Sequence, residues 1–189
     1  MKSLIRFIVF SNLWVAFCVL GLALSSELLF STSNYHISQF VFFATLFTYN
    51  FQRVVRIEKG LNHVRKVWLA KQNIAIYILI ACGGLGSAYR FFEFQLITQV
   101  IIVIVGLLSV LYPFGLRKIP FSKIFIISFV WAVSTMLLLI LENDILISQN
   151  IVFHLLSRFL FVFAITIPFD IRDLKYDAQN LQTIPLFFG

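Results

Sequence analysis

The run of residues 4–24, LIRFIVFSNLWVAFCVLGLAL, decides the class of fold. As a helix it is long enough to cross about 30 Å of hydrocarbon, and it is too long for the core of a signal peptide. No cleavage site of small residues follows it. We therefore predict a retained first transmembrane helix, in a chain that is inserted into a membrane and not secreted.

The composition of the whole chain points the same way. Of its 189 residues, 60% are hydrophobic, 12% are charged and 23 are Phe, far more apolar area than a soluble domain of this size could bury. The net charge of +7 comes from Lys and Arg in short gaps between apolar runs, which indicates membrane topology and not nucleic-acid binding. The sequence thus predicts an all-α integral membrane protein, a single multi-pass helical bundle with membrane lipid around it and no nucleic-acid partner.

Six segments have the length of a transmembrane helix. They are residues 4–24, 37–55, 67–89, 94–113, 121–141 and 145–168, followed by an Asp-rich loop at 169–185. All 15 basic residues except Arg90 and Arg158 lie at the N-terminus, around the second and fourth gaps or after the sixth span. This asymmetry predicts a bacterial-type inner membrane protein with both its N-terminus and the Asp-rich loop in the cytoplasm. The remaining gaps hold acidic residues: Glu27, Glu93, Glu142 and Asp144.

Three carboxylates follow the sixth span, at Asp170, Asp173 and Asp177. In a helix, spacings of three and four residues place them on one face. Three like charges so close together repel one another unless a cation lies among them, and oxygen ligands reached from the cytosol suit Mg²⁺. The alternative is a solvated acidic loop balanced by Arg172 and Lys175.

A metal-bound diphosphate also needs cationic partners, and the same predicted face supplies them. Guanidinium groups bind phosphate oxygens with two parallel hydrogen bonds. The candidates are Arg53, Arg56, Arg117, Lys118 and Arg172.

Two further patterns lie inside the spans. Asn150, His154 and Arg158 form a polar stripe at spacings of four, which should face the bundle interior or water because an Arg in hydrocarbon is costly. Gly83 and Gly86, in the third span, are small enough to let two helix backbones approach closely.

Three stretches together resemble the UbiA superfamily of intramembrane prenyltransferases. FDIRDLKYDAQNLQTIP, at 169–185, is similar to the second aspartate-rich motif of the family, with its trailing Thr183 and Pro185. LYPFGLRKIPFSK, at 111–123, is similar to the basic segment between the fourth and fifth helices. Asn50 stands where the first motif of the family begins, after the second helix.

The resemblance implies a bundle of nine helices, of which this chain covers about six. In that family Mg²⁺ holds the diphosphate of a prenyl donor, and the allylic cation left by its departure alkylates a lipophilic acceptor. On this basis Asp170, Asp173 and Asp177 are the predicted catalytic and metal-binding residues. The predicted diphosphate-binding residues are Asn50, Arg53, Arg56, Tyr112, Arg117, Lys118 and Arg172.

The sequence departs from the family in two places. After Asn50 the expected carboxylates are replaced by FQRVVR, so we hypothesise that Arg53 and Arg56 contact the diphosphate directly in place of a second metal. The chain ends at Gly189, where a seventh helix should begin. It is then a fragment, or its bundle is completed by a second chain, or its product is inactive.

Two other functions stay open: an impaired relative that binds an isoprenoid or a partner, and a small membrane transporter or scaffold.

Overall fold

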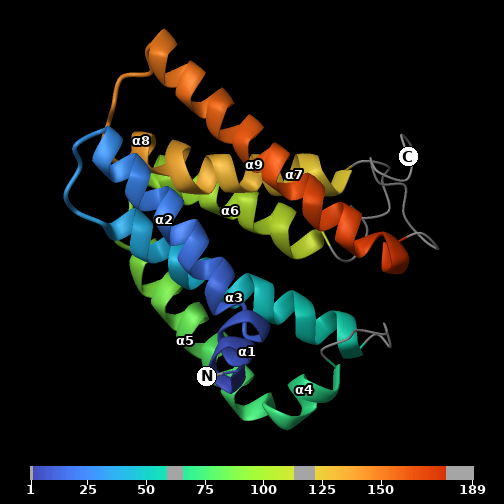
Figure 1. Ribbon diagram of the computed structural model, residues 1–189. Coiled ribbons are helices and arrows are strands. Elements are labelled where there is room, and N and C mark those ends of the chain that lie inside the picture. The colour runs from blue at the N-terminus through green and yellow to red at the C-terminus, as the bar shows by residue number, and fades with distance from the viewer. Residues whose placement is uncertain (1, 59–65, 113–121, 178–189) are drawn as a thin grey trace. The chain divides into compact units, whose positions relative to one another are not determined.

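A computed structural model describes residues 2–58, 66–112 and 122–177, and all regular structure in these ranges is helical (Figure 1). This confirms the all-helical fold class. The chain divides into two units, residues 1–99 and 100–189, with the boundary inside helix α6 (Leu96–Leu111).

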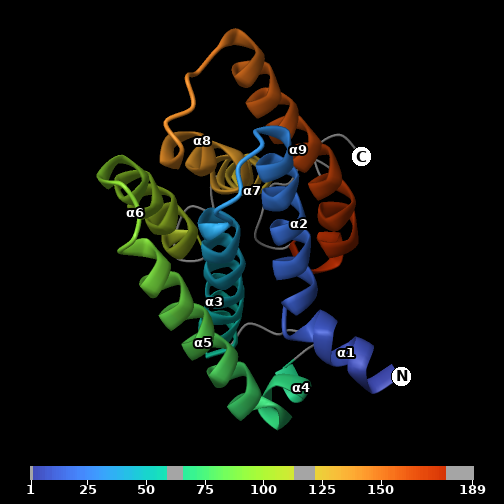
Figure 2. The same cartoon turned by 90° about the vertical axis from the view of Figure 1, so that its left-hand side faces the viewer.

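The first unit is built around helix α3 (His36–Glu58), which packs against α2 (Leu13–Leu29) and α5 (Asn73–Phe91). Figure 2 shows α3 between these two neighbours. Two short helices, α1 (Lys2–Phe10) and α4 (Lys66–Lys71), precede α2 and α5.

Close packing of α5 on α3 confirms the prediction made from its glycines. A Cβ atom built on Gly83 would lie 2.7 Å from the backbone nitrogen of Phe47 and 2.8 Å from the carbonyl oxygen of Phe43. One on Gly86 would lie 2.7 Å from the Phe43 ring. The two backbones therefore touch where only glycine fits.

The first predicted span is not one straight helix. Helices α1 and α2 meet at a 65° bend, and Asn12 between them adopts a left-handed conformation with φ of 61°. Asn tolerates this conformation better than most residues because its short polar side chain can bond locally. The helix also continues past residue 24, to Leu29.

The second unit contains a helix interrupted by a π-turn, and a long helix packed on it. The first comprises α7 (Ser122–Ala132), the π-helix η2 (Val133–Leu137) and α8 (Leu138–Glu142), and the second is α9 (Gln149–Asp177). Helix α9 packs against α7 and η2. Leu138, Leu139 and Ile140 of α8 are fully buried.

Within the described ranges three helices are long and apolar enough to cross a membrane: Asn73–Phe91, Ser122–Glu142 and Gln149–Phe169. The bent pair α1 and α2 raises this to four if it counts as one span. Helix α6 is shorter, and the last part of α3 is polar. These helices are consistent with a membrane protein. The count of six spans is not confirmed, and the orientation stays a prediction.

Candidate functional site

A buried polar network occupies the bend between α1 and α2. Ser11 is fully buried and Asn12 is 1% exposed. The side-chain nitrogen Nδ2 of Asn12 donates a hydrogen bond of 3.0 Å to Oδ1 of Asn50 on α3. The bend is thus tied to the central helix of the first unit.

Asn50 has no exposed surface, and its amide group is engaged on both sides. Besides accepting from Asn12, it donates through Nδ2 to the carbonyl oxygens of Ser11, at 2.9 Å, and Leu46, at 2.8 Å. An amide nitrogen has two donor hydrogens, so these two bonds use both. Asn50 thereby gives a hydrogen-bond donor to the carbonyl oxygen of Ser11, which lies at the break between α1 and α2.

Arg53 lies one turn after Asn50 and joins the same network. Its Nη2 donates to Oδ1 of Asn12 at 3.0 Å, so Asn12 links the two predicted diphosphate-binding residues Asn50 and Arg53. The Arg53 side chain is half-buried. Arg56 belongs to α3, and its side chain lies outside the described part of the structure.

Asn12 is the residue of this network that sequence reasoning missed. The available signal was the adjacent polar pair Ser11 and Asn12, in the middle of an otherwise apolar run. Such a pair competes with helical hydrogen bonds and favours a break.

Replacing Asn50 with leucine is expected to lower the free energy of unfolding by about 2 to 4 kcal/mol, because the Asn12 amide and the Ser11 carbonyl would remain buried without this partner. Thermal unfolding in detergent measures the change. Asn50→Asp is the matched control for shape. It keeps an acceptor for Asn12 but places a carboxylate against the carbonyl oxygens of Ser11 and Leu46 in a buried site, so we expect a loss at least as large. Equal stability of Asn50→Leu and the native chain would contradict a structural role for the network.

The three predicted metal-binding residues lie on α9, which is helical from Gln149 to Asp177. The predicted loop at 169–185 is therefore wrong for residues 169–177, and its remaining residues lie outside the described ranges. The helix passes through Pro168 without ending there. Asp170, Asp173 and Asp177 thus follow a segment that is long and apolar enough to cross a membrane, without a break in the backbone helix. Their side chains are outside the described part of the structure.

The other predicted ligand residues are only partly visible. Tyr112 directly follows α6, and its side chain is half-buried. Arg117 and Lys118 lie outside the described residues, and Arg172 has a described backbone in α9 only. Among the side chains that the structure describes, no group of three or more His, Cys, Asp or Glu could hold a metal ion. The side chains of the three aspartates lie outside that part of the structure, so the Mg²⁺ site stays a prediction.

The polar stripe on α9 divides between two environments. Arg158 is half-buried, and its Nη1 lies 3.4 Å from Oγ1 of Thr135 in the π-helix η2. Asn150 and His154 are exposed. The predicted inward orientation therefore holds for Arg158, whose charge approaches the polar side chain on the neighbouring helix.

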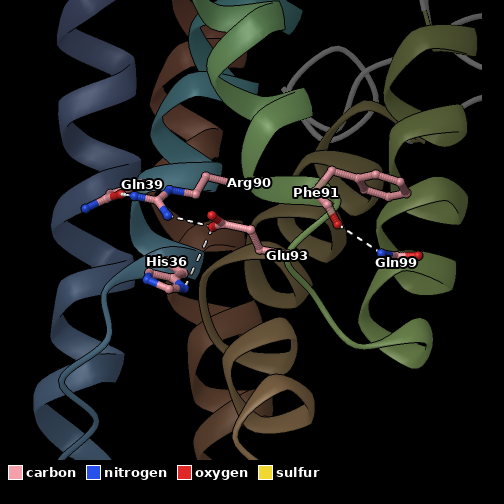
Figure 3. Close-up of polar contacts among 6 residues, drawn as sticks. All are labelled: His36, Gln39, Arg90, Phe91, Glu93 and Gln99. Carbon is pink, nitrogen blue, oxygen red and sulfur yellow. Dashed lines mark hydrogen bonds and ion pairs between the residues drawn. The ribbon is translucent and has the colours of Figure 1, made fainter.

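A second polar cluster joins the start of α3 to the end of α5 (Figure 3). Nη1 of Arg90 donates to Oε2 of Glu93 at 2.6 Å, and Nδ1 of His36 lies 4.0 Å from the same oxygen. Arg90 also donates to Gln39. The side chain of Gln99 caps the end of α5 by donating to the Phe91 carbonyl oxygen at 3.1 Å.

The hydrogen bond from Arg90, and then its charge, hold the pKa of Glu93 below its usual value of about 4.5. A carboxyl with a lowered folded-state pKa stabilises the fold above its unfolded pKa and loses that contribution as the pH falls through its folded pKa. We therefore expect the stability of the native chain to decline more steeply below about pH 4.5 than that of Glu93→Gln. Thermal unfolding across this range, with both proteins in the same detergent, tests the difference. Parallel curves would contradict it.

One further carboxyl was not predicted to be buried. Glu27 lies in the last turns of α2 with no exposed surface, and Ser38 donates to its Oε1 at 2.9 Å. Thr32 donates to the other oxygen. These hydroxyls satisfy the carboxyl group and connect α2 to the start of α3.

No model of a known protein family matches the chain, and comparisons with curated proteins and with solved structures also found no match.

Proposed function

We propose that the protein is an intramembrane prenyltransferase of the UbiA type, which transfers an isoprenoid group from a prenyl diphosphate to a lipophilic acceptor with the help of Mg²⁺. The observation that supports this most is the course of α9. It runs as one helix from an apolar, membrane-length segment into Asp170, Asp173 and Asp177. A prenyl diphosphate has the same division, with an apolar chain that prefers the membrane and an anionic head that prefers its surface.

The donor set fits a magnesium ion. Three carboxyl groups at spacings of three and four on a helix offer hard oxygen ligands on one side of it. When bound, Mg²⁺ would stabilise the negative charge that develops on the departing diphosphate. The aspartates would hold the ion, and Arg172, Arg117 and Lys118 would bind diphosphate oxygens. Tyr112 would orient the same group from the end of α6.

The network around Asn12 changes the role that we propose for Asn50. Both donor hydrogens of Asn50 already bond to the carbonyl oxygens of Ser11 and Leu46. In this proposal Asn50 therefore holds Asn12, and through Asn12 the side chain of Arg53, in position. Arg53 donates to Asn12 through its Nη2. In this proposal Arg53 and Arg56 bind the diphosphate in place of a second metal.

One observation favours a second function, that of a catalytically impaired relative. Asn50, at the start of the degenerate first motif, serves the bend of the helix and has no exposed surface. A protein that has lost its first metal site could still bind an isoprenoid diphosphate through the aspartates of α9. Such a protein would bind a donor and transfer nothing.

Two assays on the purified chain in detergent test the proposal. Binding of a labelled prenyl diphosphate, with Mg²⁺ and with a chelator in its place, tests the site. Release of diphosphate in the presence of a panel of aromatic acceptors tests turnover. Metal-dependent binding with release supports the prenyltransferase, and binding without release supports the impaired relative. No metal-dependent binding would overturn both.

A further inference from the structure

Helix α1 has two faces of opposite character. Lys2 and Arg6 are one turn apart and share its polar face with Ser3. Leu4 and Ile5 lie on the side of the helix away from Arg6 and are 64% and 56% exposed, whereas Val9, which is 37% exposed, lies beside Arg6. A short helix with basic residues on one face and exposed aliphatic residues on the other is typical of a helix that lies in the interface of a membrane.

The bend at Asn12 also turns α1 into a direction that suits a helix lying in the membrane interface. At 65° to α2, its nine residues extend only about 6 Å along the α2 axis. The 17 residues of α2 already extend about 25 Å, most of the hydrocarbon thickness. Helix α1 therefore runs mainly across the end of α2 and adds little to the depth that is spanned.

Trp68 of α4 holds α1 in this position. Its ring meets Phe7 and Phe10 edge to face, with centroid distances of 5.9 and 5.4 Å. Arg6 lies over the ring of Phe10, 5.4 Å from its centroid. Tryptophan is enriched where proteins cross the boundary between lipid and water, because its ring is apolar and its N–H is polar.

Helix α4 continues the same combination of charge and apolar surface. Lys66 and Lys71 lie at its two ends, Lys71 is exposed, and Val67 is 71% exposed. The sequence has no acidic residue at 1–26 or 59–92. The positive charge of this region is therefore not balanced by nearby carboxylates of the same segments.

From these contacts we infer that α1 and α4 form one surface, the α1–α4 surface (residues 2–10 and 66–71), which lies in the headgroup layer and binds anionic phospholipid. Arg6 and Lys71 attract the lipid phosphates, while Leu4, Ile5 and Val67 enter the acyl region below them. A soluble anion would meet the same cations but would leave these aliphatic side chains in water. The inference is independent of the prenyltransferase proposal, because it concerns the membrane-facing surface and not the aspartates.

Depth measurement tests the position of α1. Spin labels are placed at Ile5→Cys or Ser3→Cys in a chain with Cys18→Ala and Cys82→Ala, in nanodiscs of phosphatidylcholine and phosphatidylglycerol. We expect the label at residue 5 to be relaxed mainly by oxygen and the label at residue 3 mainly by a water-soluble nickel chelate. Equal exposure of both to the chelate, or a position of both deep in the bilayer, would overturn the inference.

Charge removal tests the class of lipid. The full chain is purified from vesicles of the same two lipids, and the bound lipids are quantified. Each of Arg6→Gln and Lys71→Gln is expected to lower the enrichment of phosphatidylglycerol about five-fold. Arg90→Gln removes the same charge at the opposite end of α5 and should leave the enrichment unchanged.

Three results would overturn the assignment. The first is an enrichment of phosphatidylglycerol that is unchanged in both Arg6→Gln and Lys71→Gln. The second is a loss of enrichment in Arg90→Gln as large as in those two variants. The third is displacement of the bound phosphatidylglycerol by inorganic phosphate at constant ionic strength. The last would identify a site for a soluble anion.

Discussion

Replacing Asp173 with asparagine is expected to weaken the magnesium-dependent binding of a prenyl diphosphate by about 100-fold or more. The substitution keeps the size of the side chain and removes one anionic ligand from the middle of the three aspartates. Changes that merely disturb the support of a metal ligand commonly cost 10- to 100-fold in affinity, and loss of a ligand should cost at least as much. Titration with a labelled donor, with Mg²⁺ and with a chelator, measures the effect.

Asp144→Asn is the matched control, because Asp144 lies in the turn before α9, at the other end of the second unit. Removing its charge should leave donor affinity unchanged. If the two variants behaved alike, or if Asp173→Asn bound as the native chain does, the aspartates on α9 would not form the proposed site.

Replacing Gly83 with alanine is expected to destabilise the protein by about 2 to 3 kcal/mol. The added Cβ would lie 2.7 Å from a backbone nitrogen of α3, and a backbone cannot move aside as a flexible side chain can. The helices α3 and α5 would have to separate along their contact. Thermal unfolding in one detergent, followed by circular dichroism, measures the loss.

Gly21 provides the comparison, since a Cβ there would meet no atom within 4 Å. Gly21→Ala should leave stability unchanged or raise it by up to about 1 kcal/mol, because alanine favours a helix more than glycine does. Equal stability of the two variants would show that the close approach of α3 and α5 does not contribute to the fold.

The helical class and the α3–α5 contact could be predicted because both depend on local features. Apolar runs of membrane length specify helices in lipid, where every backbone group needs a partner within the segment. Gly83 and Gly86 are three residues apart and so share one side of such a run, and small residues on one side of a helix let a second helix approach closely.

The bend at Asn12 was missed for a physical reason. Hydropathy over residues 4–24 is high enough for a span, so the local pattern favoured one straight helix. The partners that stabilise the break, Asn50 and Arg53, lie 38 and 41 residues away from Asn12. No periodicity connects positions so far apart in the chain.

The last span was predicted to end at Pro168, close to the Phe169 at which the membrane-length segment ends, but the helix itself continues although proline commonly ends helices in water. In a membrane-spanning helix, neighbouring groups can satisfy the backbone that a proline frees, and α9 continues for nine residues beyond Pro168, to Asp177. The cluster of His36, Arg90 and Glu93 could not be predicted from the sequence either, because it depends on the packing of α3 on α5.

Counting bound manganese tests the central claim most directly. Mn²⁺ prefers the same oxygen ligands as Mg²⁺, and its free form is measured by electron paramagnetic resonance. Because the first motif lacks carboxylates, we predict that, with a prenyl diphosphate present, the native chain binds a single Mn²⁺ beyond the amount that the diphosphate binds without protein, and that Asp173→Asn binds it about 100-fold more weakly. No binding by the native chain, or equal binding by the variant, would contradict a prenyl diphosphate site at the end of α9.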